Sequence, residues 1–513
     1  MGAVTVGIVG VSPQDVVEVA RHGATVQIAD DSLAEMRRSR AAVEALAADP
    51  QPHYGISTGF GALATTQIPV ERRNQLQRSL IRSHAAGSGP EVEREVVRAT
   101  MLLRLSTLAT GRTGIRASTA VKYAGLLTAG ITPVVREYGS LGCSGDLAPL
   151  AHCALTLIGE GAARDIDGTS MPSVQALAAA GLEPVRLAEK EGLALINGTD
   201  GMLGQLILAL HDLNTLVTTA DIAAAMSVEG QLGTDDVFAA DLQALRPHPG
   251  QAISAANLRA MMAGSGIRES HRTSACTRVQ DAYSLRCSPQ VHGAVRDTMA
   301  HASVVAGREL TSAIDNPMVT PDLRVESNGN FHGAPVAYVL DFLAIAVADM
   351  AGISERRTDR FLDPARNHGL SPFLAHDPGV DSGMMIAQYT QAGIVSELKR
   401  LAAPSSVDSI PSSAMQEDHV SMGWHAARKL RRSLDGLTRV LAIEVLTAAR
   451  GVELRTPHTP APGTAAVINL LRTAGVPGPG PDRFLTPEIT TAVELVGTGD
   501  IRDAAERAIG RLG

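Results

Sequence analysis

The stretch that decides the fold class is residues 334–355, APVAYVLDFLAIAVADMAGISE. A helix through residues 334–351 is apolar on more than one face, so it needs neighbours on more than one side. Asp341 and Asp349 interrupt the run, and a membrane-spanning helix would rarely contain both. The stretch therefore predicts a buried helix, either in the deep core of a monomer or in a subunit interface.

Four further runs share this helical periodicity, and all lie beyond about residue 200. They are Met202–Met226, Gln290–Ser312, Met384–Leu401 and Met422–Arg450. The N-terminal part differs, because glycine-rich interruptions divide it into shorter segments. We therefore expect a mainly α protein of two domains, with short helices and loops in residues 1–205 and a long-helix bundle with C-terminal helices in residues 206–513.

Two helix starts can be located near the N-terminus. Ser12-Pro13-Gln14-Asp15 combines an N-cap serine, a first-turn proline and an acidic residue, and Gly23 supplies the stop. Ser32-Leu33-Ala34-Glu35 has the capping-box pattern and predicts a helix from there to Asp49-Pro50. Thr25–Ile28 is the candidate strand between the two helices.

Composition narrows the class of protein. The 513 residues include 45 Lys and Arg and 53 Asp and Glu, which gives a formal charge of −8. A basic nucleic-acid-binding protein is therefore excluded as the default interpretation. Aromatic residues are only 3% of the chain, so the core must use small and aliphatic side chains. Four cysteines are too few for a disulfide framework and indicate a reducing cytosol. Residues 1–16 lack the basic start and the long apolar core of a signal peptide, so we expect no export. Histidine and cysteine spacing predicts no metal site.

One loop matches a hydrolase motif. Residues 55–59, GISTG, fit the G-x-S-x-G pattern in which a serine, here Ser57, sits on a strand-to-helix turn. The preceding residues predict a helix end followed by proline, so the required strand is missing. A serine hydrolase is therefore a weak rival reading.

Residues 140–152, SLGCSGDLAPLAH, carry a more specific pattern, and six other motifs accompany it along the chain. These are YGISTGFG at 54–61, SHAAG at 83–87, NGT at 197–199, QDAYSLR at 280–286, GNFHG at 329–333 and QEDHVS at 416–421. In this order they resemble the signature of the aromatic amino acid ammonia-lyases. The resemblance implies that family's all-α, fumarase-like fold over almost the whole chain.

The resemblance also implies a cofactor made from the chain itself. Cys143, Ser144 and Gly145 would cyclise with loss of two waters to 4-methylidene-imidazol-5-one (MIO), with no external cofactor. Glycine suits a position whose amide nitrogen must attack a nearby carbonyl, because a Cβ would obstruct that approach. Serine supplies the methylene by losing its hydroxyl, and Cys143 contributes only its carbonyl. Asp146 either assists ring formation or caps the following helix.

The roles of other residues follow from the same resemblance. Tyr54 is the candidate base for the β-proton, provided that its pKa lies well below the usual ~10. Arg286 has the planar fork that pairs with a substrate carboxylate. The resemblance gives supporting contacts to cofactor or substrate to the remaining residues, which are Asn197, Gln280, Tyr283, Phe331 and Gln416. Phe331 is also compatible with plain packing.

The substrate pocket is assigned by the same comparison of motifs. Ser83-His84 occupies the pair of positions at which tyrosine and phenylalanine lyases resemble His-Leu or Phe-Leu, and Glu417 stands where phenylalanine enzymes carry glutamine. Both indicate a polar pocket suited to an imidazole, with Met385 as an apolar wall or as core filling. We expect elimination of ammonia from L-histidine to trans-urocanate, the first step of histidine degradation. The alternatives are a tyrosine or phenylalanine lyase or aminomutase, and a non-catalytic helical scaffold.

Assembly and location complete the expectations. The resemblance implies a homotetramer with active sites shared between subunits. Partners other than the small-molecule substrate, such as nucleic acid or a membrane, are not expected, and the chain is assigned to the cytoplasm.

Overall fold

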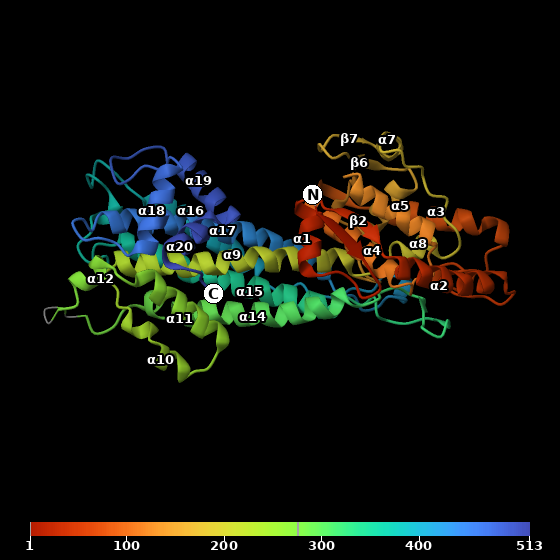
Figure 1. The fold of residues 1–513 in the computed structure, drawn as a ribbon, viewed down its shortest axis with the longest axis horizontal. Coiled ribbons are helices and arrows are strands. Elements are labelled where there is room, and N and C mark those ends of the chain that lie inside the picture. Colours follow the sequence, from red (N-terminus) through yellow and green to blue (C-terminus); the bar gives the residue numbers. More distant parts are fainter. Residues whose placement is uncertain (1, 274–275, 277) are drawn as a thin grey trace. The chain divides into compact units, whose positions relative to one another are not determined.

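The computed structural model describes residues 2–273, 276 and 278–513 (Figure 1). Contacts between Cα atoms group the chain into two compact units. Unit 1 comprises residues 1–208, 303–341 and 404–428, and unit 2 comprises residues 209–302, 342–403 and 429–513. Four long helices contain residues of both units: α9 (Asp200–Gly230), α14 (Ser288–Leu310), α15 (Ala334–Leu362) and α17 (Gly423–Glu453). The division of the chain into domains at residues 205 and 206 stays a prediction.

Unit 1 combines short helices with small sheets. Its helices are α1 (Pro13–Arg21), α2 (Asp30–Ala48), α3 (Arg73–His84), α4 (Arg94–Ala109), α5 (Ala117–Thr128), α6 (Leu147–Leu157), α7 (Ser173–Ala179) and α8 (Glu191–Ala194). Its strands are β1 (Ala3–Val6), β2 (Thr25–Ile28), β3 (Ser88–Glu91), β4 (Thr132–Pro133), β5 (Arg136–Tyr138), β6 (Ala162–Arg164), β7 (Ser170–Pro172), β8 (Met318–Val319) and β9 (Val325–Glu326). β1 pairs with β2 in parallel, and the other pairs, β3–β5, β4–β6–β7 and β8–β9, are antiparallel.

The centre of unit 1 is α4, which packs against α1, α5 and α6. Residues 96–109 of α4 are all buried. Two arginines on this helix donate to carbonyl groups: Arg98 donates to Val19 O at 2.9 Å, and Arg104 donates to Asn197 O at 2.8 Å. The buried Arg104 therefore ties the core helix to one of the predicted site residues.

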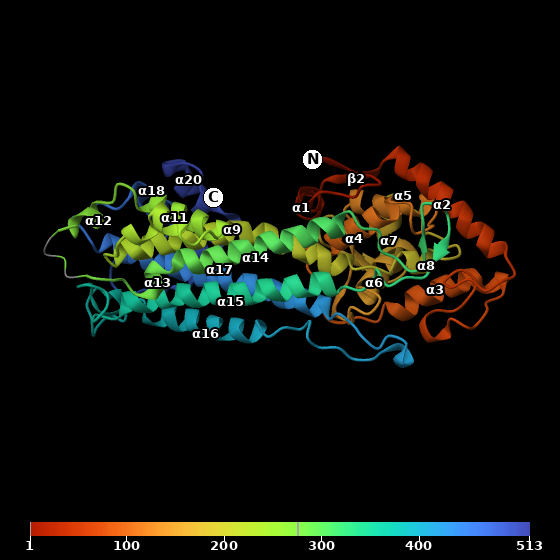
Figure 2. The same ribbon diagram turned by 90° about the horizontal axis from the view of Figure 1, so that it is seen from below.

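Unit 2 is built from helices. Besides its parts of the four long helices it contains α10 (Ala240–Ala244), α11 (Pro249–Met262), α12 (Gly266–Ser270), α13 (Tyr283–Arg286), α16 (Met385–Leu401), α18 (Pro462–Thr473), α19 (Thr486–Thr498) and α20 (Asp500–Ile509). Figures 1 and 2 show α9, α14, α15 and α17 side by side within this unit. The predicted long helices and the mainly α fold class are confirmed.

The predicted helix ends are confirmed in part. Ser12 caps α1 in a complete capping box, because its hydroxyl accepts from Asp15 N and the Asp15 carboxylate accepts from Ser12 N. Thr25–Ile28 is strand β2, as expected. The predicted start of α2 at Ser32 is wrong: the helix begins at Asp30 after Ala29, and Ser32 is buried in the first turn. Burial against the core overrides the local capping pattern there.

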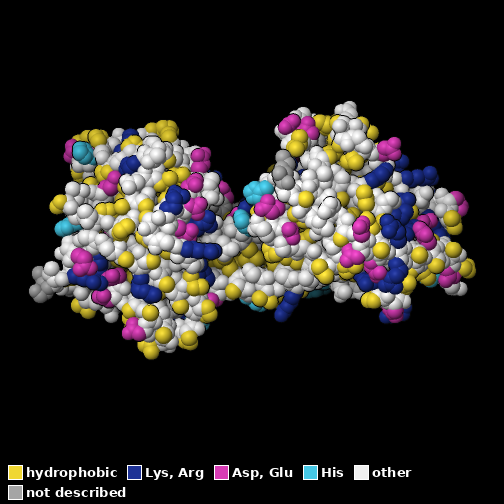
Figure 3. Space-filling model, in the orientation of Figure 1, with side chains coloured by type: hydrophobic (Ala, Val, Ile, Leu, Met, Phe, Trp, Pro, Cys, Tyr) yellow, Lys and Arg dark blue, Asp and Glu magenta, His cyan; other side chains and the backbone are white. Residues whose placement is uncertain are grey.

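Two helices, α9 and α15, are long and apolar enough to cross a bilayer by length and composition alone. Most of the apolar window of each is buried inside the protein, which is typical of core helices. Asp341 in α15 is buried and accepts the backbone N–H of Ser406 at 2.7 Å. On the face drawn in Figure 3, acidic and basic side chains are interspersed with apolar ones.

Candidate active site in unit 1

A cavity of about 470 Å³ in unit 1 brings together five of the predicted site residues, namely Tyr54, His84, Ser144, Asn197 and Glu417. They come from loops and helix ends separated by up to several hundred residues in the sequence. The rest of the wall consists of Gly59, Phe60, Gly61, Leu63, Thr66, Ile68, Leu76, Ser79, Leu80, Ser83, Leu147, Leu193, Asn316 and Ser413. The volume and the mixture of an apolar wall with a few polar groups are typical of a small-molecule site.

The Cys143-Ser144-Gly145 segment is a tight turn whose ends, Gly142 and Gly145, are bridged in antiparallel fashion. Ser144 has a φ of +49°, which is unusual for a residue with a side chain, and Gly145 has a φ of +83°. A Cβ built on Gly145 would lie 2.1 Å from the carbonyl oxygen of Gly198. The turn thus requires glycine on both conformational and steric grounds.

Asn197 contacts this turn from the short segment between α8 and α9. Its Nδ2 donates to the carbonyl oxygen of Ser144 at 2.8 Å, and its own carbonyl accepts from the buried Arg104. The Oδ1 atom of Asn197 is buried without a hydrogen-bond partner among the described residues. An unpaired buried acceptor costs free energy unless a ligand donates to it, so Asn197 presents both a donor and a vacant acceptor to the site.

Asp146 is fully buried directly after the turn. Its Oδ1 accepts from Ser140 Oγ at 3.0 Å, and its Oδ2 accepts from Met202 N at 2.8 Å. Burial raises the pKa of the Asp146 carboxyl to about 7, although these hydrogen bonds oppose the shift. Asp146 stands at the N-cap position of α6, as the capping alternative expects, although its side chain makes no capping hydrogen bond.

Tyr54 lies at the start of the loop that closes one side of the cavity, and its Oη accepts from Gly61 N at 3.3 Å. Burial raises the pKa of the Tyr54 phenol, and the nearby carboxylates of Glu417 and Asp315 raise it further. The expected lowering is therefore absent in the single chain, because burial and neighbouring acids outweigh the Gly61 amide. Ser57, the hydrolase candidate, is fully buried and accepts from His53 N, and the element directly before its loop is helix α2, not a strand.

His84 ends α3 at the cavity wall. Its Nδ1 lies 2.9 Å from the carbonyl oxygen of Leu80, so this nitrogen carries the hydrogen and donates. Burial lowers the pKa of His84, which favours the neutral ring. A neutral ring protonated at Nδ1 leaves Nε2 as a hydrogen-bond acceptor for a ligand.

Glu417 stands in a short hairpin closed by backbone hydrogen bonds with Ser412, and its Oε2 accepts from Ser412 Oγ at 3.1 Å. The same carboxylate lies near the Cys143 thiol. Burial raises the pKa of that thiol to about 11, and the charge of Glu417 adds to the shift. Cys143 is therefore a neutral thiol at physiological pH.

Gln280, Tyr283 and Arg286 form a cluster of their own in unit 2. Arg286 Nη2 donates to Gln280 Oε1 at 3.0 Å, and its Cζ lies 4.7 Å from the centroid of the Tyr283 ring. Met385, at the start of α16, also belongs to unit 2. None of these four residues is on the wall of the cavity described above.

Phe331 and Gln416 belong to unit 1 and lie outside the cavity wall. Phe331 is half-buried and Gln416 is exposed. His332 Nε2 contacts the carbonyl oxygen of His419 at 3.3 Å, so the two motifs that contain Phe331 and Gln416 adjoin each other.

Several wall residues were not predicted from the sequence. Leu76 and Leu80 lie one turn apart on α3, with Ser79 beside them and the predicted Ser83 one turn further on, and this helical spacing could have indicated a common face. Leu193 and Asn316 carried no such signal, because each is brought to the cavity by tertiary contacts alone. Among the residues that the structure describes, no three His, Cys, Asp or Glu side chains are grouped as metal ligands.

Comparison with known proteins agrees with this geometry. Residues 11–473 match the family described as aromatic amino acid lyase. The chain belongs to this family.

Relatives within the aromatic amino acid lyase family extend over the full chain. A histidine ammonia-lyase of Streptomyces coelicolor is 62% identical over 512 residues, with 100% of both chains covered. The crystal structure of a histidine ammonia-lyase from Trypanosoma cruzi superposes with a TM-score of 0.90 at 36% identity, covering 98% of this chain and 95% of that one. A tyrosine aminomutase from Streptomyces globisporus gives a TM-score of 0.93 at 37% identity, with 100% of both chains covered.

Proposed function

We propose that the protein is a carbon-nitrogen lyase that eliminates ammonia from L-histidine to give trans-urocanate. The observation that carries the proposal is the pairing of two polar groups, His84 and Glu417, with Ser144 and Tyr54 around one cavity. His84 offers an acceptor and Glu417 a carboxylate, and both suit the N–H groups of an imidazole ring. The relative from Streptomyces coelicolor, named a histidine ammonia-lyase, supports the same substrate.

The MIO group fits the residues that would form it. Gly145 has no Cβ to obstruct the turn, Ser144 already adopts a positive φ, and Asn197 donates to the Ser144 carbonyl. The MIO ring, once formed, supplies an electrophile that makes the amino group of the substrate a competent leaving group. Asn197 would hold the Ser144 carbonyl of such a ring through its Nδ2 donor, a position in which a preorganised donor favours negative charge on the oxygen.

Other side chains remove the β-proton and bind the substrate. Tyr54 takes the β-proton at its Oη. The pKa of its phenol is raised in the single chain. A positive charge from the substrate or from a neighbouring subunit is therefore needed to lower this pKa. Arg286, with Gln280 and Tyr283, holds the substrate carboxylate. We assign supporting contacts to Phe331, Met385 and Gln416, and assistance in ring formation to Asp146.

The proposal includes a cytoplasmic homotetramer in which subunits share active sites. Arg286 and Tyr54 belong to different units of the chain, and Tyr283 is 71% exposed although it is assigned to the site. Phe342 and Ile345 leave apolar side chains half-exposed on α15, which suits contact with another subunit. We also retain the two-domain division at residues 205 and 206 as part of the proposal.

The test of the proposed function is a substrate panel read by ultraviolet absorbance. Purified protein is mixed separately with L-histidine, L-tyrosine and L-phenylalanine, and we expect the conjugated acid to appear with L-histidine. Coumarate from tyrosine without urocanate from histidine would transfer the assignment to the tyrosine alternative. Intact-protein mass should fall short of the translated chain by two waters, and an unmodified mass would remove the MIO proposal.

A further inference from the structure

A buried ion pair in unit 2 has no part in the chemistry proposed above. Arg357 on α15 and Glu444 on α17 are both fully buried, and Arg357 Nη2 donates to Glu444 Oε2 at 2.9 Å. Removing two charges from water is costly, and an apolar pair of the same size is often at least as stabilising. Stability alone therefore does not account for this pair, and the contacts of Arg357 and Glu444 indicate which segments the pair holds in place.

Two serines complete the environment of the Glu444 carboxylate. Ser227 on α9 donates to Oε1 at 2.8 Å, and Ser354 on α15 donates to Oε2 at 2.6 Å. Together with Arg357 they satisfy both oxygens, so the carboxylate and the guanidinium are fixed with respect to three helices. The Arg357 guanidinium is thus held in one orientation.

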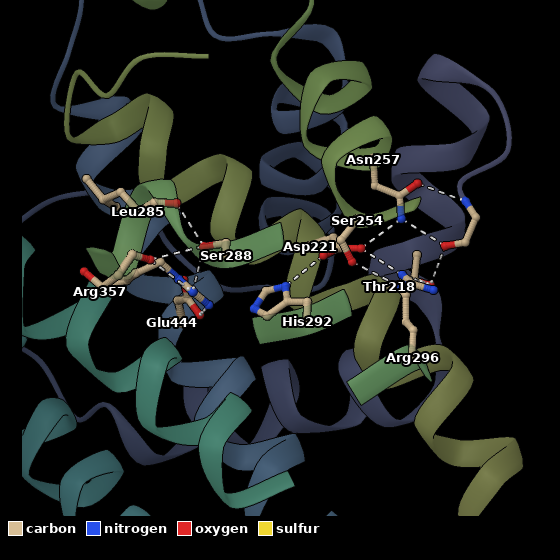
Figure 4. A network of polar contacts seen from close by, with 12 residues as sticks. Thr218, Asp221, Ser254, Asn257, Leu285, Ser288, His292, Arg296, Arg357 and Glu444 are labelled. Carbon is tan, nitrogen blue, oxygen red and sulfur yellow. Dashed lines mark hydrogen bonds and ion pairs between the residues drawn. The ribbon is translucent and has the colours of Figure 1, made fainter. Parts of the chain in front are cut away.

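The remaining nitrogen of Arg357 reaches the segment before Arg286 (Figure 4). Arg357 Nη1 donates to Ser288 Oγ at 3.3 Å and approaches the carbonyl oxygen of Ser284 at 3.4 Å. Ser288, fully buried at the start of α14, donates through the same hydroxyl to the carbonyl oxygen of Leu285 at 3.0 Å. Of the two residues immediately before Arg286, Ser284 therefore contacts Arg357 directly, and Leu285 is linked to Arg357 through Ser288.

Arg286 itself is oriented by short-range contacts that depend on this segment. Its Nε donates to the carbonyl oxygen of Asp281 at 2.9 Å, and its guanidinium lies over the ring of Tyr283. All these groups lie on α13 or just before it, and α13 is a single short turn. A turn this short has little stability of its own, so its position depends on what anchors it.

We propose that Ser288, held by the Arg357–Glu444 pair, is a positioning residue that sets the place of the Arg286 guanidinium for the substrate carboxylate. The inference rests on the proposed function, because it takes Arg286 as the carboxylate-binding group. Its effect passes through Arg286 alone, and Ser288 touches no substrate.

The test compares two buried serines that each lose one hydroxyl. Ser288→Ala should raise KM for L-histidine by about tenfold and should change kcat less. The reason is that a displaced Arg286 guanidinium loses one of its two hydrogen bonds to the substrate carboxylate. The matched control is Ser254→Ala, because Ser254 is also fully buried and accepts from Arg296 Nε at 3.1 Å without touching α13 (Figure 4). Ser254→Ala should leave KM unchanged at a similar loss of thermal stability. Ser288→Thr, which keeps the hydroxyl, should restore KM.

A second arm separates positioning from general stability. In an Arg286→Lys background, Ser288→Ala should change KM by less than about twofold, because the group through which it acts is already altered. Equal increases in both backgrounds, or equal KM values for Ser288→Ala and Ser254→Ala, would overturn the inference. If Ser288→Ala does not fold, Ser288→Cys takes its place in the same comparison.

A wild-type protein that deaminates no amino acid overturns the proposed function and this inference together. Normal wild-type activity with an unaltered KM in the Ser288 variant overturns only the inference.

Discussion

Gly145 is the residue at which backbone geometry limits the proposed chemistry most directly. A methyl group there would lie 2.1 Å from the Gly198 carbonyl oxygen, and the φ of +83° is itself unfavourable for alanine. We expect Gly145→Ala to abolish deamination and to show the full mass of the unmodified chain. Intact-protein mass spectrometry and the urocanate assay measure both outcomes.

Gly168 provides the matched control for that substitution. It has nearly the same φ, +84°, and nothing lies within 4 Å of a Cβ built upon it. Gly168→Ala therefore carries only the conformational strain, about 1 kcal/mol, and should retain both the mass deficit and the activity. A mass deficit in Gly145→Ala would contradict the steric argument.

Asp146 gives a prediction about pH. Its pKa is about 7 in the folded protein against 3.8 for an ordinary aspartate, because it is buried. As pH rises from about 4 to 7 the unfolded chain loses this proton while the folded chain keeps it, so the folded state loses stability, by at most about 4 kcal/mol. The melting temperature of Asp146→Asn should therefore rise relative to wild type across this window and level off above pH 7.

The control for this profile is Asp322, an exposed residue. Hydrogen bonds from Arg324 and Thr320 lower the pKa of Asp322 to about 2, so this carboxyl is ionised in both states above pH 5. The melting-temperature difference of Asp322→Asn should not vary with pH there. A flat profile for Asp146→Asn as well would show that the folded protein ionises Asp146 normally.

Asp146 and Tyr54 show how much of the site could be predicted from the sequence. The motif around residues 140–152 placed Asp146 beside the turn, but its partner Met202 lies 56 residues away and could not be inferred from spacing. The raised pKa of Tyr54 was missed for the same reason, since it results from burial and from Glu417 and Asp315. Residue types were predictable, whereas their electrostatics depend on tertiary contacts.

At the scale of elements, sequence predicted the long helices well because their apolar periodicity extends over many turns. α15 occupies Ala334–Leu362 and α17 occupies Gly423–Glu453, close to the expected runs. Short signals were less reliable: the capping box at Ser12 is real, and the similar pattern at Ser32 lies inside α2. A four-residue pattern is easily outweighed by packing.

The α3 helix carries a prediction about substrate choice. Ser83 and His84 lie at its C-terminal end on the cavity wall, with Leu76 and Leu80. Ser83→Phe combined with His84→Leu makes this face apolar and removes the acceptor for an imidazole N–H. We expect kcat/KM for L-histidine to fall about 100-fold or more, and the rate with L-phenylalanine relative to L-histidine to rise.

The neighbouring Arg82 supplies the control on the same helix. It is half-exposed, lies off the cavity wall and pairs with Glu160 at 2.7 Å. Arg82→Gln should leave the ratio of the two rates unchanged. An unchanged ratio in the double substitution would instead remove α3 from the specificity pocket.

At the scale of the whole molecule, the sequence predicted which motifs contribute to the site. It did not predict whether one chain or several chains supply the residues of one site. The cavity of unit 1 collects Tyr54, His84, Ser144, Asn197 and Glu417, while the Arg286 cluster belongs to unit 2. Family resemblance supplied the idea of shared sites, and hydrophobic periodicity could not, because an apolar helix face fits a core as well as an interface.

Complementation between two inactive variants tests whether the sites are shared. Tyr54→Phe removes the base and Arg286→Ala removes the whole guanidinium group, so each homo-oligomer should be nearly inactive. If Tyr54 and Arg286 of one site come from different chains, about a quarter of the sites in randomly mixed oligomers contain both intact residues. Co-expression of the two variants should therefore recover about that fraction of wild-type kcat, measured by urocanate formation. If both residues of a site came from one chain, every chain would carry a defect and co-expression would recover nothing, which would refute shared sites while leaving each residue's role intact.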